Sequence, residues 1–131
     1  MNAIQNLKAV AAYAGATINT ATDTDSTIII DTKGYDFLKM SVLSGAITAA
    51  GSGATVKVME STASNGANPT EATALGSKGA FTADGDDNVV RSTDVVLSKR
   101  YALLRITSAA SFNGIILGAV AILGNKRLPS D

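Results

Sequence analysis

The chain has 131 residues, which is enough for one domain with a single hydrophobic core and too few for two ordinary domains. Eleven Lys and Arg residues balance eleven Asp and Glu residues, so the chain has no net positive charge to attract nucleic acid or anionic lipid. It contains no Cys and no His, which excludes thiolate nucleophiles, disulfide bonds, the usual zinc sites and a side chain that titrates near neutral pH.

The first sixteen residues differ in pattern from the rest of the chain. Ile4, Leu7, Ala11 and Ala14 recur at helical spacing, which predicts a short amphipathic helix or an arm that docks on the domain. From Thr17 onward the chain is rich in Thr, Ser, Asp, Gly and β-branched residues, which suit strands better than helices. We therefore expect an N-terminal arm over residues 1–16 and a β-domain over residues 17–131.

Three strands are predicted in the first part of this β-domain. The succession Ile28, Ile29, Ile30 indicates a strand within residues 26–31 that is covered on both faces. Residues 35–43 and 54–60 alternate between apolar and polar side chains, which predicts strands with one face on a core. The apolar positions are Leu38, Met40 and Val42 in the first of these and Ala54, Val56 and Val58 in the second.

Turn signals dominate the middle of the chain. Residues 61–87 are rich in Gly, Ala, Asn and Thr and include Asn-Gly, Asn-Pro and Asp-Gly pairs, which are typical of turns. Here we expect loops with short strands near residues 72–75 and 80–82. Strands are predicted again at residues 88–91, 94–98 and 101–108. Short strands separated by frequent turns favour an all-β sandwich or barrel.

The last apolar segment, residues 115–123, is predicted to be a strand that is apolar on both faces. A helix with Gly114 and Gly118 as small-residue packing positions is the alternative, but β-branched residues and flanking glycines favour a strand. One face can fill the core, and the other is either covered within the domain or meets a partner. The alternation assigns Ile116, Val120 and Ile122 to one face and Ile115, Leu117 and Leu123 to the other.

No transmembrane helix is expected, because the longest apolar run, residues 112–124, is shorter than the ~20 residues that such a helix needs.

Carboxylates offer no recognisable catalytic or metal-binding pattern. Asp84, Asp86 and Asp87 could supply alternating oxygen ligands, but Val89 and Val95 stand where a calcium loop needs Gly and Glu. We therefore expect a solvated turn there, no metal, no cofactor and no enzymatic activity. A pair of carboxylates facing each other, as in glycosidases, is the remaining enzymatic alternative.

Two basic pairs occur at a predicted turn and near the end of the sequence. Lys99 with Arg100 and Lys126 with Arg127 either face solvent or pair with acidic residues of a partner.

Several segments, taken in order, resemble one family: small virion proteins of tailed bacteriophages that are encoded near the major capsid protein and decorate the head. The resemblance covers nearly the whole chain, although each motif is short. It comprises QNLK at residues 5–8, KGYD at 33–36, TVKVMES at 55–61, SKRY at 98–101 with Arg105, and GAVAILGN at 118–125 with Pro129.

This resemblance implies a decoration or cement protein that binds the major capsid protein across capsomer junctions. It implies a single antiparallel β-sandwich of jelly-roll type, a homo-oligomer such as a dimer or trimer, and a place on the capsid surface after synthesis in the host cytoplasm. A tail or fibre component that binds a carbohydrate or another virion protein is the alternative. From the residues themselves, we expect the partner interface to include Ile4, Leu7, Ile115, Leu117, Leu123, Lys126 and Arg127.

Overall fold

The computed structural model describes residues 7–19, 21, 23–109 and 111–124, and within these residues all regular structure is β-strand. The strands in chain order are β1 (Lys8–Tyr13), β2 (Ala16–Ile18), β3 (Asp23–Asp25), β4 (Ile30–Asp31), β5 (Phe37–Ala49), β6 (Ala54–Ser61), β7 (Thr70–Glu71), β8 (Thr73–Ala74), β9 (Ala80–Phe81), β10 (Val90–Val96), β11 (Tyr101–Ser108) and β12 (Asn113–Gly124).

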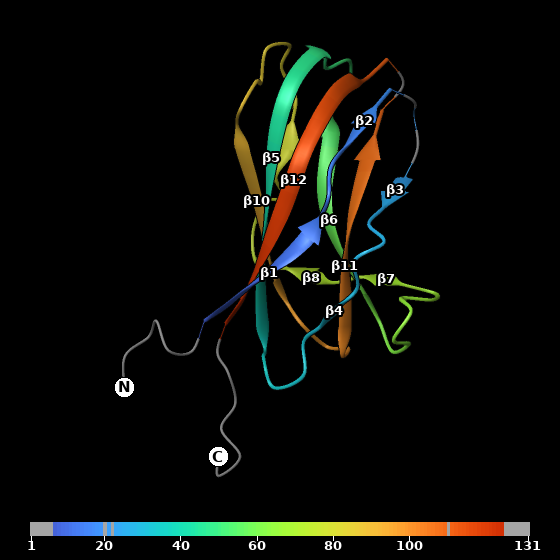
Figure 1. Ribbon diagram of the computed structural model, residues 1–131, viewed down its shortest axis with the longest axis vertical. Coiled ribbons are helices and arrows are strands. Elements are labelled where there is room, and N and C mark those ends of the chain that lie inside the picture. Colours follow the sequence, from blue (N-terminus) through green and yellow to red (C-terminus); the bar gives the residue numbers. More distant parts are fainter. Residues whose placement is uncertain (1–6, 20, 22, 110, 125–131) are drawn as a thin grey trace.

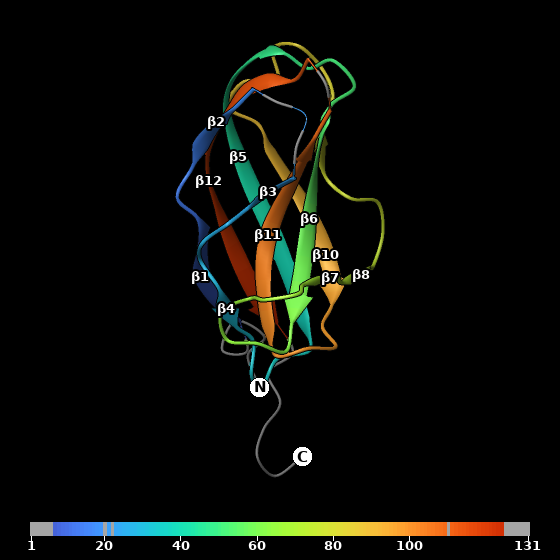
Figure 2. The ribbon, with the colours of Figure 1, turned by 90° about the vertical axis from the view of Figure 1, so that its right-hand side faces the viewer.

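These strands form two antiparallel sheets that pack face to face (Figures 1 and 2). Sheet A has the order β1-β12-β5-β10-β8, with β2 also paired to β12. Sheet B has the order β3-β11-β6-β7, with β4 paired to β11 and β9 to β6. The predicted all-β antiparallel sandwich is therefore confirmed.

The connections follow the jelly-roll order. The pairs β1/β2 and β3/β4 each occupy one position along the chain, and β7 with β9 occupies another, so the fold has eight main strand positions in sequence order. The short strand β8 lies between β7 and β9 in the sequence but pairs with β10 at the edge of sheet A. Sheet A then contains positions 1-8-3-6 and sheet B contains positions 2-7-4-5. Consecutive positions mostly alternate between the sheets, as in a double Greek-key jelly roll.

Alternate residues of the long strands fill the core between the sheets, as their sequence pattern predicted. Two phenylalanines, Phe81 of the short strand β9 and Phe112 of the segment before β12, are fully buried and complete this core. The largest strand residues in it are Leu38, Met40, Val42, Val56, Val58, Val95, Leu104, Ile106, Ile116 and Leu123.

The N-terminal helix prediction is wrong for the described residues. Lys8–Tyr13 forms β1, which pairs with β12 from Lys8 opposite Leu123 to Ala11 opposite Val120. After Gly15, β2 continues along the same edge of β12. The small, Ala-rich sequence satisfies helical and strand spacing alike, and pairing with β12 decides between them. Residues 8–13 and Ala16 of the predicted arm are thus paired in the sheet, whereas Ile4 lies outside the described residues.

Other differences concern strand boundaries. Only Ile30 of the three consecutive isoleucines lies in a strand; Ile28 and Ile29 are half-buried in irregular chain, so the prediction of a strand covered on both faces was wrong. The two strands expected within residues 88–98 are one strand, β10. The two short strands expected near residues 72–75 and 80–82 are present as β8 and β9.

The last strand corrects one predicted interface residue. Leu123 is fully buried, although it was assigned to the same outward face as Ile115 and Leu117. The pairing between β12 and β5 shifts between Gly114 and Gly118, and these irregularities change which face the following residues occupy. Ala119, Ala121 and Leu123 therefore point into the core, while Val120 is exposed.

Candidate functional site

The outer face of sheet A carries most of the exposed apolar side chains of the described chain. Leu43 lies opposite Val90 on β10 and opposite Gly118 on β12, so side chains from three strands meet there. We call this surface the apolar face and define it by Phe37, Leu43, Val90, Ile115, Leu117, Val120 and Ile122.

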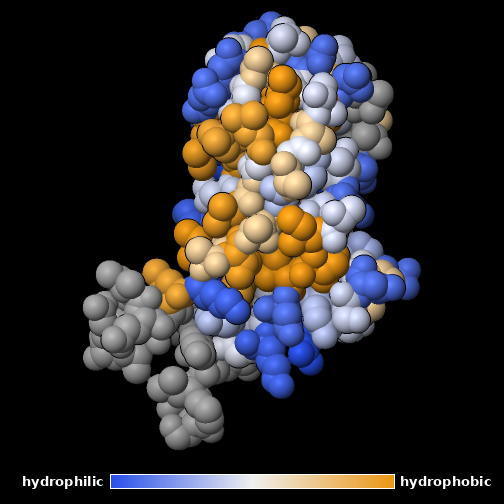
Figure 3. All heavy atoms as spheres, in the orientation of Figure 1, coloured by the Kyte–Doolittle hydropathy of each residue, from blue (hydrophilic) through white to orange (hydrophobic). Residues whose placement is uncertain are grey.

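Most side chains of the apolar face are well exposed. Val90 is 56% exposed, Leu117 49% and Val120 46%. Six of the seven residues of the face expose more than a third of their surface, and clustered exposed apolar side chains are typical of interaction sites. Figure 3 shows apolar side chains gathered over β5 and β12, with a second group lower down near β1.

The apolar face is hollowed in two places. A depression of about 390 Å³ lies between β10, β5 and β12 and is lined by Leu43, Val90, Leu117 and Val120, among others. A second hollow of about 370 Å³ lies nearer the beginning of β5. Its apolar lining includes Leu7, Phe37, Leu75 and Ile122. Such shallow apolar hollows fit protruding side chains of another protein surface.

The polar side chains within this face pair with one another. Lys39 Nζ lies 3.3 Å from Asp94 Oδ1, and the hydroxyl oxygens of Ser41 and Ser92 lie 3.0 Å apart. In both cases the two residues lie directly opposite each other on β5 and β10. A partner could therefore cover the face without leaving these polar groups unpaired, which keeps the cost of removing water low.

The outer face of sheet B has the opposite character. Arg105 makes a bidentate pair with Asp25, with Nε 2.5 Å from Oδ1 and Nη2 2.9 Å from Oδ2. Asp23 accepts a hydrogen bond of 2.8 Å from the Thr107 hydroxyl. The hydrogen bond to Asp25 raises the pKa of Arg105. This charged surface is suited to contact with water, so the sandwich has one apolar and one polar outer face.

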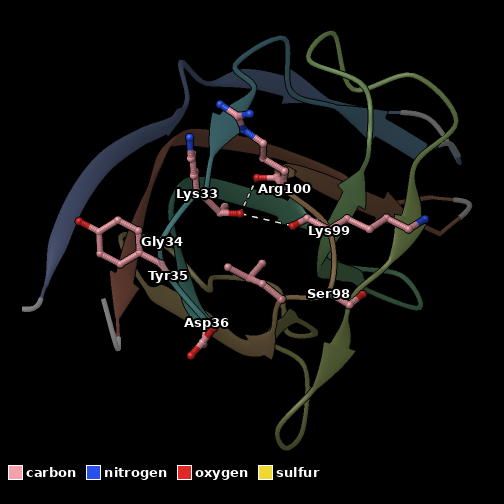
Figure 4. A pocket seen from close by; sticks show the side chains of 9 residues that line it. Lys33, Gly34, Tyr35, Asp36, Ser98, Lys99 and Arg100 are labelled. Atoms are coloured by element: carbon pink, nitrogen blue, oxygen red, sulfur yellow. Dashed lines mark hydrogen bonds between the residues drawn. The ribbon is translucent and has the colours of Figure 1, made fainter. Parts of the chain in front are cut away.

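One end of the sandwich has a more polar hollow of about 400 Å³. It lies between the loops of residues 32–36 and 97–100, two of the segments that carry the family resemblance. The Thr32 hydroxyl donates to the Arg100 carbonyl at 2.5 Å and ties the loops together. Figure 4 shows the charged side chains of Lys33, Lys99 and Arg100 directed away from the hollow.

These cations also have partners within the chain. Arg100 pairs with Asp31, with Nη2 2.9 Å from Oδ2, and Lys99 Nζ donates to Thr70 Oγ1 at 2.7 Å. The hydrogen bond from Arg100, assisted by the Lys33 backbone amide, lowers the pKa of Asp31 to about 2. The predicted basic pair Lys99 and Arg100 thus has partners within the same chain, at its surface.

The acidic cluster of Asp84, Asp86 and Asp87 holds a loop in place by accepting hydrogen bonds from backbone amides. Asp84 Oδ1 accepts from the Ala50 amide at 2.6 Å, and Asp87 Oδ1 accepts from the Ile47 amide at 2.8 Å. Asp86 Oδ2 accepts from the amides of its own loop. Across the described ranges no group of acidic side chains is arranged to hold a metal ion. The carboxylates instead cap backbone amides that the irregular end of β5 leaves unpaired.

The two glutamates do not form a facing pair. Glu71 lies opposite Met59, the neighbour of Glu60, so the side chains of Glu60 and Glu71 point to opposite faces of sheet B. Glu60 is buried and accepts hydrogen bonds from Ser98 and Lys99. Glu71 is exposed and pairs with Lys78.

The structure places the predicted interface residues in different environments. Ile115 and Leu117 are exposed on the apolar face. Leu7 is also exposed and lines the second hollow, near the beginning of β5. Leu123 is in the core, and Ile4, Lys126 and Arg127 lie outside the described residues.

Sequence reasoning missed Leu43, Val90 and Val120. Leu43 and Phe37 could have been found, because they share the outward parity of Lys39 and Ser41 along β5. Val90 and Val120 required knowledge of the pairing between β5, β10 and β12.

No family model matches the sequence, and no curated protein matches it either. None of the described residues belongs to a helix that is long and apolar enough to cross a membrane.

Proposed function

We propose that the protein is a bacteriophage head decoration protein that binds the major capsid protein through the apolar face of sheet A. The observation that carries this proposal is the contrast between the two outer faces: one is apolar with internally paired polar groups, and the other is charged. An adhesive protein on a shell needs such a contrast, because one side contacts the shell while the other contacts water.

Three further features support the proposal. The motif resemblance points to head decoration proteins, and the jelly-roll order is a recurrent architecture among virion proteins. The described carboxylates are occupied in caps and ion pairs. A cement protein stabilises the assembled shell by mass action, since it binds the assembled state more tightly than free capsid subunits.

Binding to shells tests the role of the apolar face. Shells are assembled from the major capsid protein encoded near this protein. They are incubated with the wild type and with the variants Leu117→Asp and Val120→Asp, and bound protein is measured after sedimentation. Each Asp would bring an unpaired charge into a covered apolar contact, so we expect about 30-fold or more weaker binding. Both side chains are largely exposed, so the free energy of unfolding should change by no more than about 0.5 kcal/mol.

Thr55→Asp is the matched control, because it adds the same charge on the outer face of sheet B. It should bind shells as the wild type does. Equal binding by all variants, or loss of binding only with Thr55→Asp, would show that the apolar face is not the docking surface. Absence of the protein from purified heads would contradict the decoration role itself, and its presence in tails would favour the fibre alternative.

A further inference from the structure

The edges of the two sheets are protected unequally. Sheet A ends at β1 and β8, and the edges of sheet B are formed by β3 with β4 and by β7 with β9. Apart from β1, each of these edge strands has only two or three residues. Very short edge strands are a common protection against pairing with another chain. β1, with six residues, is the long edge strand of the described chain.

The first half of β1 is suited to pairing. Ala9 and Ala11 are exposed, and within the described part of the chain no strand pairs with β1 on the side away from β12. The open stretch ends at Ala12, whose carbonyl accepts a hydrogen bond of 2.6 Å from the Ser26 hydroxyl. Residues 8–11 contain neither Pro nor a bulge, either of which would disrupt a new ladder.

We propose that β1 pairs antiparallel with β1 of a second copy of this chain, so that sheet A continues from one copy into the next. Antiparallel pairing of identical segments is self-complementary about a two-fold axis, as a closed dimer requires. Lys8 of each copy then lies at opposite ends of the new ladder, so the two charges do not face each other.

This pairing also explains the small residues at the edge of the apolar face. Ala9 and Ala11 lie opposite Ile122 and Val120 on β12, so they share the outer face of sheet A. When two β1 strands pair, the two apolar faces lie side by side with only alanines between them. The pairing thus doubles the apolar surface that one assembly offers, whichever partner that surface binds.

The expected affinity is low. A ladder of about four residues buries far less than the roughly 800 Å² per partner of a standard stable interface. The dimer should therefore depend on protein concentration in solution, and neighbouring copies held on a common surface would pair more readily because their effective concentration is higher.

Disulfide trapping of the purified full-length protein tests this inference. The natural sequence has no Cys, so the variants Ala9→Cys and Ala11→Cys each contain a single thiol. Facing Cβ atoms across an antiparallel ladder lie close enough for a disulfide, and diagonal neighbours are further apart. Because both apolar faces lie on the same side, Ala9 faces either Ala9 or Ala11 of the second copy. We therefore expect either Ala9→Cys alone or an equimolar mixture of Ala9→Cys and Ala11→Cys to form a disulfide-linked dimer about tenfold faster than Ala46→Cys under mild oxidation.

Ala46→Cys is the matched control, because Ala46 is an exposed alanine on β5, away from β1. Melting temperatures of the reduced variants verify the fold. Equal trapping rates at all three positions, or fastest trapping at Ala46, would overturn the proposal and the latter would indicate face-to-face association. Because this experiment uses neither shells nor the variants at Leu117 and Val120, its failure would leave the proposed capsid binding untouched.

Discussion

The Glu60 carboxylate connects two parts of the molecule that are distant in sequence. It is buried and accepts hydrogen bonds from the Ser98 amide at 2.9 Å, from the Lys99 amide at 3.2 Å and from the Ser98 hydroxyl. These bonds fix the turn between β10 and β11, which also lines the polar hollow. A buried carboxylate with three donors is well satisfied, whereas the donors without it would be buried and unpaired.

Replacing Glu60 should therefore destabilise the fold. We expect Glu60→Ala to lower the free energy of unfolding by about 3 kcal/mol and Glu60→Gln by about half as much, because Gln keeps one acceptor oxygen. Urea unfolding followed by circular dichroism measures both values. Glu71→Ala removes an exposed glutamate of the neighbouring strand and should change stability by less than about 0.5 kcal/mol. Similar losses for Glu60→Ala and Glu71→Ala would contradict this role.

At the scale of the strands, Gly15 joins the two segments that form one edge of sheet A. Its φ is +100°, and a Cβ placed there would lie 2.4 Å from the Leu117 carbonyl oxygen. The contact is with backbone, which cannot move without disturbing the pairing of β12. Gly34 has a similar φ of +89°, but a Cβ there would have no atom within 4 Å.

The comparison of these two glycines separates backbone strain from steric conflict. Gly34→Ala should cost about 1 kcal/mol, the typical penalty for a side chain at positive φ. Gly15→Ala should cost about 3 kcal/mol or more, because the conflict with Leu117 adds to that penalty. Thermal unfolding of the two variants measures the difference. Equal losses of stability would mean that the backbone at this edge of sheet A moves to accommodate the added Cβ.

The strands also show what the sequence could and could not predict. Alternation located β5, β6, β11 and β12 because each has one face on the core, so burial repeats every second residue. Beyond Gly118 the same rule failed: Leu123 is inside and Val120 outside, since the shifts in pairing depend on β5. Ile115 and Leu117, which lie within the shifted stretch, were assigned to the correct face.

The local sequence pattern did not predict the structure where pairing with a strand that is distant in the sequence determines it. Residues 8–13 are Ala-rich, and only their pairing with β12 makes them a strand. For the same reason the apolar face was only partly predicted. Ile115 and Leu117 were found, but Leu43 and Val90 join them only through the order of strands in sheet A.

At the scale of the whole molecule, the charges are distributed so that the proposed docking through the apolar face should depend little on salt. The chain is neutral overall, and the charged pair of the apolar face, Lys39 with Asp94, is internal to the face. Charged pairs on the outer face of sheet B would remain in water in the complex.

We therefore expect the affinity for shells to change less than about threefold between 50 and 500 mM NaCl, because apolar contacts are not screened by ions. Sedimentation of shells with bound protein across this range measures the effect. A loss of affinity by an order of magnitude or more would instead point to docking through basic residues such as Lys126 and Arg127.

The antiparallel pairing of β1 with β12 has a mechanical consequence. Lys8 lies opposite Leu123, so the start of β1 and the end of β12 are neighbours at one end of the sandwich (Figure 1). A force that pulls these two points apart acts across the ladder and opens its hydrogen bonds one after another. A force along the strands must break them together. The sandwich should therefore yield easily when its two strand ends are separated, and resist strongly when load runs lengthwise through sheet A.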